Sequence, residues 1–468
     1  MTRTDTNWDA AAAAHLARRA GFGATPSELD GLVQLGRKAA IAQFVDFPQE
    51  SPDLENEMRQ VGGTLTDFGE GEGVTLGSVG DLARASWLYR MVREPNPLRE
   101  KLTLFWHDHF ACQSSKIVRR PQYMGQVETF RRHAAGSFRE LLLAVAQDGG
   151  MLAYLDNRLN DARNPNENWS RELLELFTLG VDKGYEQRDV YELARVFTGW
   201  TSPNLNSTKF IYDPKLHDSN DKLLFGEPIE GRTGIAGMEE GVEALDRILT
   251  KPECATFLAR KLIAWFVNHE PDEAHVREIA DVLRRADYSI RAALDALFSS
   301  DWFFAAENRS NRFKNPVELT VSAARLLELR NPHLAGLEHH TRVLGMDLFE
   351  PPSVAGWDQG ATWANSGSTV ARTQFALQMS ATPSSPLNIT GSPAINFGAL
   401  CGEATSDGEL VAKLANRLLQ AELPEHAAIE AYLAQFEINP TWNEKRVAME
   451  KTRAVIHLLL ASPRFAVA

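Results

Sequence analysis

The chain has 468 residues, of which 44 % are hydrophobic and 24 % charged, as is usual for soluble globular proteins. Its formal net charge of −13 argues against nucleic acid as a partner, because such a surface repels phosphates. No segment reaches the roughly 18 consecutive apolar residues of a membrane span, and the start lacks the apolar core of a secretory signal, so we expect a cytoplasmic protein.

Apolar residues recur every three or four positions along most of the chain, which predicts a mainly α-helical, multi-helix globular fold. Strand-like alternation is limited to 209–213 (KFIYD), paired with 222–225 (KLLF), which predicts a small β-hairpin or ribbon near residues 209–225. The predicted helices span residues 10–20, 80–92, 98–110, 126–147, 167–179, 189–197, 241–249, 254–269, 273–286, 290–298, 317–329, 371–378, 409–419, 427–436 and 445–460.

Two predicted helix starts share the pattern Asn-Pro-x-Glu, at Asn164 and at Asn315. Asparagine caps the first free N–H groups of a helix, proline suits the first helical position, and the glutamate can reach back to the cap. We therefore expect both asparagine side chains to accept backbone hydrogen bonds.

The stretch 380–407 is rich in Ser, Pro, Gly and Thr, which predicts a long loop. It would separate a C-terminal helical hairpin at 408–468 from two larger parts, a motif-bearing half at 1–235 and a second helical half at 236–379. Three widely separated cysteines do not make a disulfide framework, so we expect reduced packing residues at Cys112, Cys254 and Cys401.

The segment 105–110 reads FWHDHF and carries two histidines on a predicted helix. At about 100° per residue, His109 falls within the apolar stripe and His107 on its flank, which predicts a buried His109 and a more exposed His107. Lys101 and Asp108 fall on the opposite, solvent side. Because the two rings point about 200° apart on a regular helix, they could share one metal ion only if the helix ended near Trp106, since an extended backbone puts positions i and i+2 on one face.

Two interpretations of His109 remain open from the residues alone. Its ring donates to a backbone carbonyl or a carboxylate and serves packing, or it faces a cavity reached by carboxylates, where it would bind metal or act as a base. The carboxylates are Glu172 and Glu175, on the helix at 167–179. The alternative there is a solvated face on which Glu167 caps and Arg171 pairs with Glu175.

A third polar element is His217-Asp218, in the loop after the strand-like KFIYD. A loop His-Asp pair can reach into a cleft, although such a dipeptide is also common in turns. The chain has no P-loop, GxSxG, HExxH or GxGxxG motif, so the usual signs of an NTPase, hydrolase, zincin or dinucleotide enzyme are absent.

Seven segments in this order resemble the uncharacterised bacterial family known as domain of unknown function 1800: HLARRAGFGATPSEL, LREKLTLFWHDHF, NPNENWSRELLELFTLGV, DVYELARVFTGW, LHDSNDKLLFG, RFKNPVEL and FEPPSVAGWDQGATWANS. The resemblance covers roughly residues 16–466 and implies a single family-length unit over 1–468. It brings no established activity. Many relatives have histidine where this chain has Phe177, so a metal site that used it would lack a ligand here.

The resemblance also implies a partner and a shared polar cleft. Members often occur beside genes for proteins that resemble sulfatases or alkaline phosphatases, which implies such a partner protein. The positions that match the family's polar motifs are His107, Asp108, His109, Asn166, Glu167, Arg171, Glu172, Glu175, His217, Asp218 and Trp357.

Two function classes follow. In the first, the protein is an enzyme for hydrolysis or transfer, with a divalent metal on His107 and His109 and catalytic groups at Glu172, Glu175, His217 and Asp218. In the second, it is a non-enzymatic binding or assembly protein, whose polar motifs fix helix packing and whose exposed aromatic residues, Trp200, Trp357 and Trp363, meet a partner. Convergence of the histidines and carboxylates on one cleft would favour the enzyme, and saturated side-chain-to-backbone hydrogen bonds would favour the second class.

Overall fold

The structure is a computed structural model, and it describes residues 8–48, 51–61, 79–117, 120–204, 207, 209–329, 335–381, 395–401, 404–421, 423–435 and 443–468. It is mainly α-helical with two small antiparallel ribbons, as the sequence predicted. None of its helices, within those ranges, is both long enough and apolar enough to cross a membrane.

The helices of the first half are α1 (Ala10–Ala20), α2 (Pro26–Leu35), α3 (Arg37–Val45), α4 (Pro52–Val61), α5 (Val79–Arg93), α6 (Pro97–His109), α7 (Arg120–Arg132), α8 (Phe138–Ala146), α9 (Gly149–Tyr154), α10 (Asn168–Glu172) and α11 (Gln187–Val196). Those of the second half are α12 (Met238–Thr250), α13 (Pro252–Phe266), α14 (Glu273–Arg285), α15 (Ile290–Ser299), α16 (Pro316–Leu326), α17 (Ala335–Val343), α18 (Ser366–Ser380), α19 (Phe397–Cys401), α20 (Asp407–Leu418), α21 (His426–Ala434) and α22 (Glu444–Ala461).

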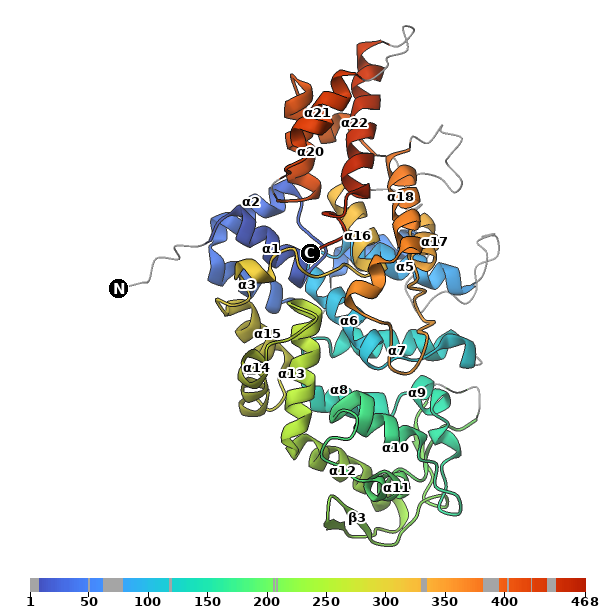
Figure 1. Cartoon of the computed structure of the whole chain (residues 1–468). Coiled ribbons are helices and arrows are strands. Elements are labelled where there is room, and N and C mark those ends of the chain that lie inside the picture. Colours follow the sequence, from blue (N-terminus) through green and yellow to red (C-terminus); the bar gives the residue numbers. More distant parts are fainter. Residues whose placement is uncertain are drawn as a thin grey trace.

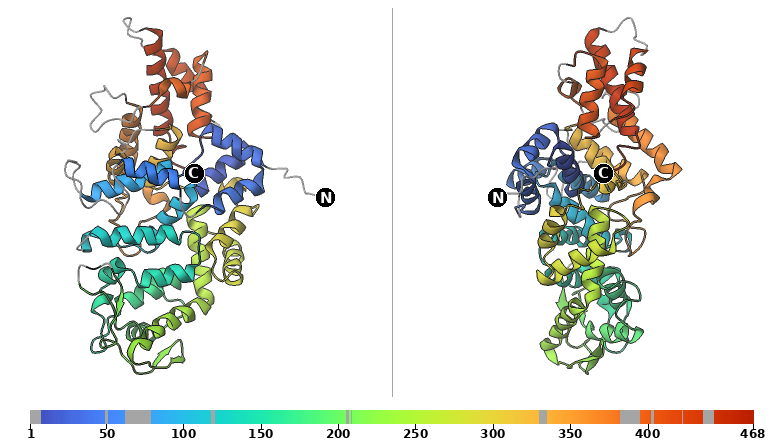
Figure 2. Two further views of the ribbon diagram at one scale, coloured as in Figure 1. Left: turned by 180° about the vertical axis from the view of Figure 1, so that it is seen from behind. Right: turned by 60° about the vertical axis from the view of Figure 1, so that its left-hand side comes forward.

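The molecule is elongated, as Figures 1 and 2 show. Helices α20–α22 form one end, and α8–α12 with the ribbons form the other. Helices α1, α6 and α16 meet between the two ends, near the end of the chain (Figure 1). Segments far apart in the sequence therefore share the central core.

Helix α6 lies in the centre of that core, and all thirteen of its residues are buried. Its first helical residue is Pro97, which needs no hydrogen-bond partner for its nitrogen there. Neighbouring helices cover every side of α6, so it has no solvent face. The expectation that Lys101 and Asp108 point to solvent is therefore wrong: both are buried.

The predicted single helix at 126–147 is in fact two, α7 and α8. The backbone between them pairs with the turn before α15: Phe138 N–H donates to Tyr288 O, and Ile290 N–H donates to Gly136 O, both at 3.0 Å. A continuous helix would have used these groups internally. Gly136 therefore lies where two distant segments pair through their backbones, and the spacing of apolar residues around it does not predict this contact.

The strands pair differently from the prediction. β1 (Trp200–Thr201) pairs with β2 (Ile211–Tyr212), and β3 (Lys222–Leu224) pairs with β4 (Glu227–Ile229). The predicted strands 209–213 and 222–225 therefore belong to two separate ribbons, because each pairs with a nearer neighbour.

The predicted loop at 380–407 contains a short helix, α19, and its residues 382–394 and 402–403 lie outside the described ranges. Cys112 and Cys254 are free and buried, as predicted, and burial raises the pKa of Cys254 to about 12. The side chain of Cys401 lies outside the described part.

Helix α16 begins as its sequence predicts. The side chain of Asn315 accepts from Glu318 N–H at 2.8 Å, and Glu318 accepts from Asn315 N–H at 2.9 Å, which completes a capping box. The same prediction for Asn164 is wrong. The backbone N–H of Asn164 donates to Asp161 in a turn. Helix α10 starts only at Asn168, and no side chain caps it.

The two asparagines give a matched pair of variants. We expect Asn315→Ala to lower the free energy of unfolding by about 1–2 kcal/mol, because it removes a cap inside the core. Asn164→Ala should change it by less than about 0.5 kcal/mol, because the residue is exposed and caps no helix. Urea unfolding of both variants measures the difference, and equal effects would contradict the capping role.

Candidate functional site

His109 is held by a backbone carbonyl. Its Nε2 lies 3.0 Å from Phe177 O, and because a carbonyl only accepts, Nε2 donates the proton. The carbonyl belongs to the last turn of a helix, where intrahelical partners run out. Burial, with the charge of Lys261, holds the pKa of His109 well below its ordinary value, so the ring is neutral. This contact is the one expected if the ring serves packing, and its Nδ1 has no hydrogen-bond partner among the described residues.

His107 is equally buried, at 1 % exposed against 2 % for His109, so the predicted difference in exposure is wrong. Phe349 N–H donates to His107 Nε2 at 3.1 Å, so this ring carries its proton on Nδ1. Burial and the charge of Arg84 lower its pKa to about 3. The ring lies against Trp87, Phe349 and Trp357.

The two imidazoles face different parts of the core, because the aromatic rings around His109 come from a separate set that includes Phe105, Phe110 and Phe177. This agrees with the angular separation expected on a regular helix. The arrangement gives the two rings no common ligand position.

Asp108 joins α6 to a distant loop. Its carboxylate accepts from Trp357 N–H at 2.8 Å and from Gln359 Nε2 at 3.2 Å, and burial raises its pKa to about 6. Gly356 has a φ of 85°, and a Cβ there would lie 2.5 Å from Asp108 O, so the loop approaches as only glycine allows. Trp357 and Trp200 are buried, which corrects their predicted exposure, and Trp363 is partly buried.

The predicted carboxylate helix consists of α10 followed by a π-helical turn, η3 (Leu173–Thr178). Arg171 pairs with Glu167 at 2.8 Å and with Glu175 at 3.3 Å, on a partly exposed face. Glu172 is half-buried, and burial followed by the nearby Glu175 raises its pKa. The helix does pack against α6, but its contact with His109 is the carbonyl of Phe177, not a carboxylate.

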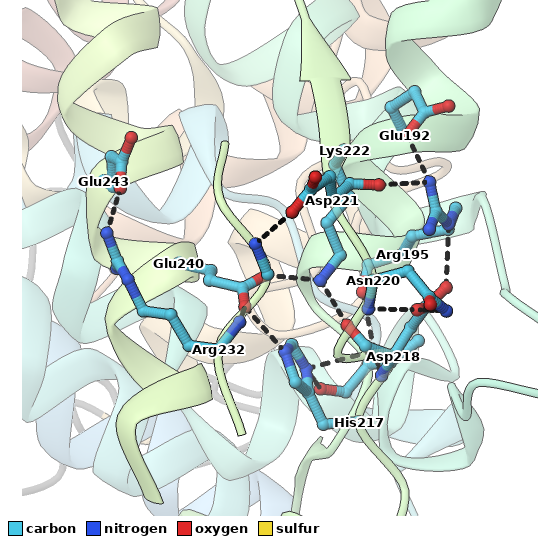
Figure 3. A network of polar contacts seen from close by, with 12 residues as sticks. Glu192, Arg195, His217, Asp218, Asn220, Asp221, Lys222, Arg232, Glu240 and Glu243 are labelled. Carbon is cyan, nitrogen blue, oxygen red and sulfur yellow. Dashed lines mark hydrogen bonds and ion pairs between the residues drawn. The ribbon is translucent and has the colours of Figure 1, made fainter. Parts of the chain in front are cut away.

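His217 and Asp218 lie in a buried polar network, which Figure 3 shows. His217 Nδ1 lies 2.9 Å from Thr198 O, and its Nε2 lies 3.2 Å from Glu240 Oε1. Each ring nitrogen therefore has a partner within the protein. Neither nitrogen is open to a ligand.

Glu240 is the centre of this network. Its second oxygen pairs with Lys222 Nζ, and all of these side chains are buried. Although burial opposes it, hydrogen bonds from His217 and Lys222 hold the pKa of Glu240 below its ordinary value. Lys222 Nζ also donates to the backbone oxygen of Asp218, which ties the loop to β3.

Asp218 is anchored from the other side. It accepts from Arg195 Nε at 2.7 Å and from Asn220 N–H at 3.0 Å. Burial opposes ionisation, but these bonds hold the pKa of Asp218 below its usual value. Arg195 is in turn paired with Glu192 at 2.6 Å. The sequence analysis missed Glu240, Lys222, Arg195 and Glu192, because their partners are close only in the folded chain.

The predicted site residues therefore lie in three separate settings. Among the described residues, no hydrogen bond or ion pair links Glu167, Glu172 or Glu175 to any of the three histidines. Within the same part of the chain, no group of three or more His, Cys, Asp and Glu side chains is placed to hold a metal ion. The predicted metal role of His107 and His109, and the catalytic role of the other four, gain no support from this arrangement.

A hollow of about 430 Å³ lies elsewhere, between α2, α3 and the turn before α6. A second hollow of about 370 Å³ lies at the C-terminal end of α16 and shares Glu28, Pro95 and Arg325 with the first. We call the two together the α2–α16 groove. Arg325 pairs with Glu28 at 3.3 Å where they meet. The apolar lining residues of the larger hollow include Leu32, Leu35, Phe44, Pro95 and Pro97.

Comparison with known proteins gives one match. A family model described as "Protein of unknown function (DUF1800)" matches residues 15–467, nearly the whole chain. No curated protein and no solved structure matches the chain.

Proposed function

The chain belongs to the DUF1800 family, whose function is unknown, and we propose that it is a non-enzymatic helical binding protein that holds a segment of a partner protein in the α2–α16 groove. Its polar motifs then serve to fix the packing of distant helices and loops. This is the second of the two function classes that the sequence left open.

The observation that supports this proposal is where the motif side chains direct their hydrogen bonds. His109 bonds to Phe177 O, His107 to Phe349 N, Asp108 to Trp357 N and His217 to Thr198 O. Each bond ties a side chain to the backbone of a segment far away in the sequence. Buried polar groups that bond in this way stabilise one packing arrangement. Nδ1 of His107 and Nδ1 of His109 have no hydrogen-bond partner among the described residues.

The groove supplies the binding surface. Its larger hollow falls in the size range of ligand sites, and two of its apolar side chains are exposed, Leu35 at 49 % and Pro95. An apolar side chain of a partner would gain by leaving water there. Arg325 and Glu28, which pair with each other, add charged groups beside it.

Three sequence predictions stay predictions beside this proposal. They are a location in the cytoplasm, a partner that resembles a sulfatase or an alkaline phosphatase, and the enzyme with a divalent metal, Glu172, Glu175, His217 and Asp218. The enzyme would need a group free to react, and Glu172 is the one of these without a hydrogen-bond partner among the described residues. We therefore test the partner first.

The test is calorimetric titration of the full chain with a purified protein of sulfatase or alkaline phosphatase type from the same organism. We expect saturable binding that Leu35→Asp weakens by about tenfold or more, because the substitution places a charge in an apolar contact. Val370→Asp is the matched control: Val370 is also exposed, at 60 %, but lies on α18 away from the groove lining.

Two outcomes would contradict the proposal. If Leu35→Asp and Val370→Asp bind like the unchanged chain, the partner uses another surface. If the unchanged chain binds neither protein, the predicted partner class is wrong.

A further inference from the structure

Helices α1, α6 and α16 meet around a group of buried cationic side chains. Arg19 comes from α1, Lys101 from α6, and Arg312 and Lys314 from the segment before α16; none is more than 7 % exposed. We call these four with Glu318 the cationic junction. They come from three segments that the sequence analysis singled out, HLARRAGFG, LREKL and RFKNPVEL, and that the proposed function leaves without a role.

Glu318 is the only carboxylate among these five side chains, and it pairs with two of the four cations. Glu318 Oε1 pairs with both Lys101 and Arg312, and its Oε2 accepts from Asn315 N–H at 2.9 Å. Among the described residues, no other side-chain carboxylate is in ion-pair contact with the junction. Buried charges are ordinarily paired, so an excess of three cations over carboxylates calls for a further anion.

Arg19 and Arg312 each have N–H groups without a hydrogen-bond acceptor among the described residues. Arg19 uses Nη2 for two neutral acceptors, Asn308 O at 2.8 Å and Asn311 Oδ1 at 2.7 Å. Its Nε and Nη1 are buried without a partner among the described residues, and so are Nε and Nη1 of Arg312. Buried guanidinium donors without acceptors are costly, because arginine cannot escape by losing its proton. The ammonium of Lys314 lies 4.2 Å from the ring centre of Phe465, and it makes no ion pair with a carboxylate among the described residues.

The cations of the junction lower one another's pKa. Burial first, and then Arg312, lower the pKa of Arg19. Burial, with Arg312 and Arg19, outweighs Glu318 and lowers the pKa of Lys101 to about 8. Burial and Arg18, with Lys101 and Arg312, lower that of Lys314 to about 7. The charges of the junction therefore act on one another.

We infer that the cationic junction binds a small oxyanion of the sulfate or phosphate class, through the open donors of Arg19 and Arg312 and the ammonium of Lys314. A guanidinium presents two parallel N–H groups that match two oxygens of a tetrahedral anion. A doubly charged anion would also cancel most of the cationic excess.

The first experiment compares sulfate with chloride at equal ionic strength, using calorimetric titration and thermal unfolding of the full chain. We expect saturable sulfate binding and a higher unfolding temperature. Lys314→Met should weaken sulfate binding by about tenfold or more, because it removes one charged hydrogen bond. It should also raise the unfolding temperature in chloride, because it relieves repulsion. Lys38→Met, an exposed position on α3, is the matched control.

Sulfate stabilises folded proteins in general, so the comparison between variants decides the result. The inference is overturned if sulfate raises the unfolding temperature of Lys314→Met as much as that of Lys38→Met. It is also overturned if titration detects no sulfate binding to the unchanged chain, which would show that the lysines are neutral and the junction needs no anion.

The pH dependence gives a second readout. Sulfate keeps both charges from pH 6 to 9, whereas Lys314 loses its proton above about 7. Sulfate affinity should therefore fall as the pH rises. The groups that act on Lys314 are Arg18 on α1, Lys101 on α6, Arg312 before α16 and Glu318 on α16. A pH-independent affinity would exclude Lys314 from the site.

Discussion

Replacing Glu318 by glutamine should lower the free energy of unfolding by about 3–5 kcal/mol. The carboxylate is buried and pairs with both Lys101 and Arg312, so the neutral amide leaves two buried cations without their anion. Urea unfolding followed by circular dichroism measures the loss.

Glu328→Gln is the control for this variant. Glu328 follows α16 and pairs with Arg417 at 3.4 Å, but its side chain is 40 % exposed. Surface pairs of this kind contribute about 0–1 kcal/mol. If the two variants lose the same stability, the burial of Glu318 has no energetic consequence and the description of the junction is wrong.

The second large effect is expected for Glu240→Gln, at about 3–5 kcal/mol, because it leaves the buried ammonium of Lys222 unpaired. Glu243→Gln is a control on the same helix, where the carboxylate pairs with Arg232 and Arg247 at 2.5 Å but is 29 % exposed. The glutamine at position 240 also lacks the negative charge that Glu240 places beside His217 Nε2.

The pH dependence of the Glu240 effect has a defined sign. The pKa of Glu240 is depressed in the folded protein, so its contribution is present above the ordinary value of 4.5 and is lost as the pH falls through the lower folded value. The difference between the unchanged chain and Glu240→Gln should therefore shrink below about pH 4.5. A difference that grows on acidification would contradict the ion pair with Lys222.

Local patterns predicted the helices well, since each depends on neighbours in the sequence. The helix at 10–20 has the predicted bounds, and the Asn-Pro-x-Glu start at Asn315 forms its capping box. The same pattern at Asn164 does not form a cap, because Asp161 accepts the Asn164 N–H and Asn160 accepts the Asn166 N–H. These turn contacts delay the helix by one turn.

The candidate site was harder to predict, since its contacts join segments far apart. A helical wheel assumes solvent on one side, but α6 is enclosed, so His107, Lys101 and Asp108 are all buried. The partners that decide their roles, Phe349, Glu318 and Trp357, lie in the second half of the chain. Nothing in the spacing of FWHDHF indicates these segments.

The central claim is that the polar motifs hold the fold and do not bind metal. Metal analysis of the purified full chain, after incubation with zinc, manganese or magnesium and removal of free ions, tests it most directly. We predict far less than one ion per chain, with no difference between the unchanged protein and His107→Gln or His109→Gln. About one ion per chain, lost when either histidine is replaced, would contradict the claim and restore the metal enzyme.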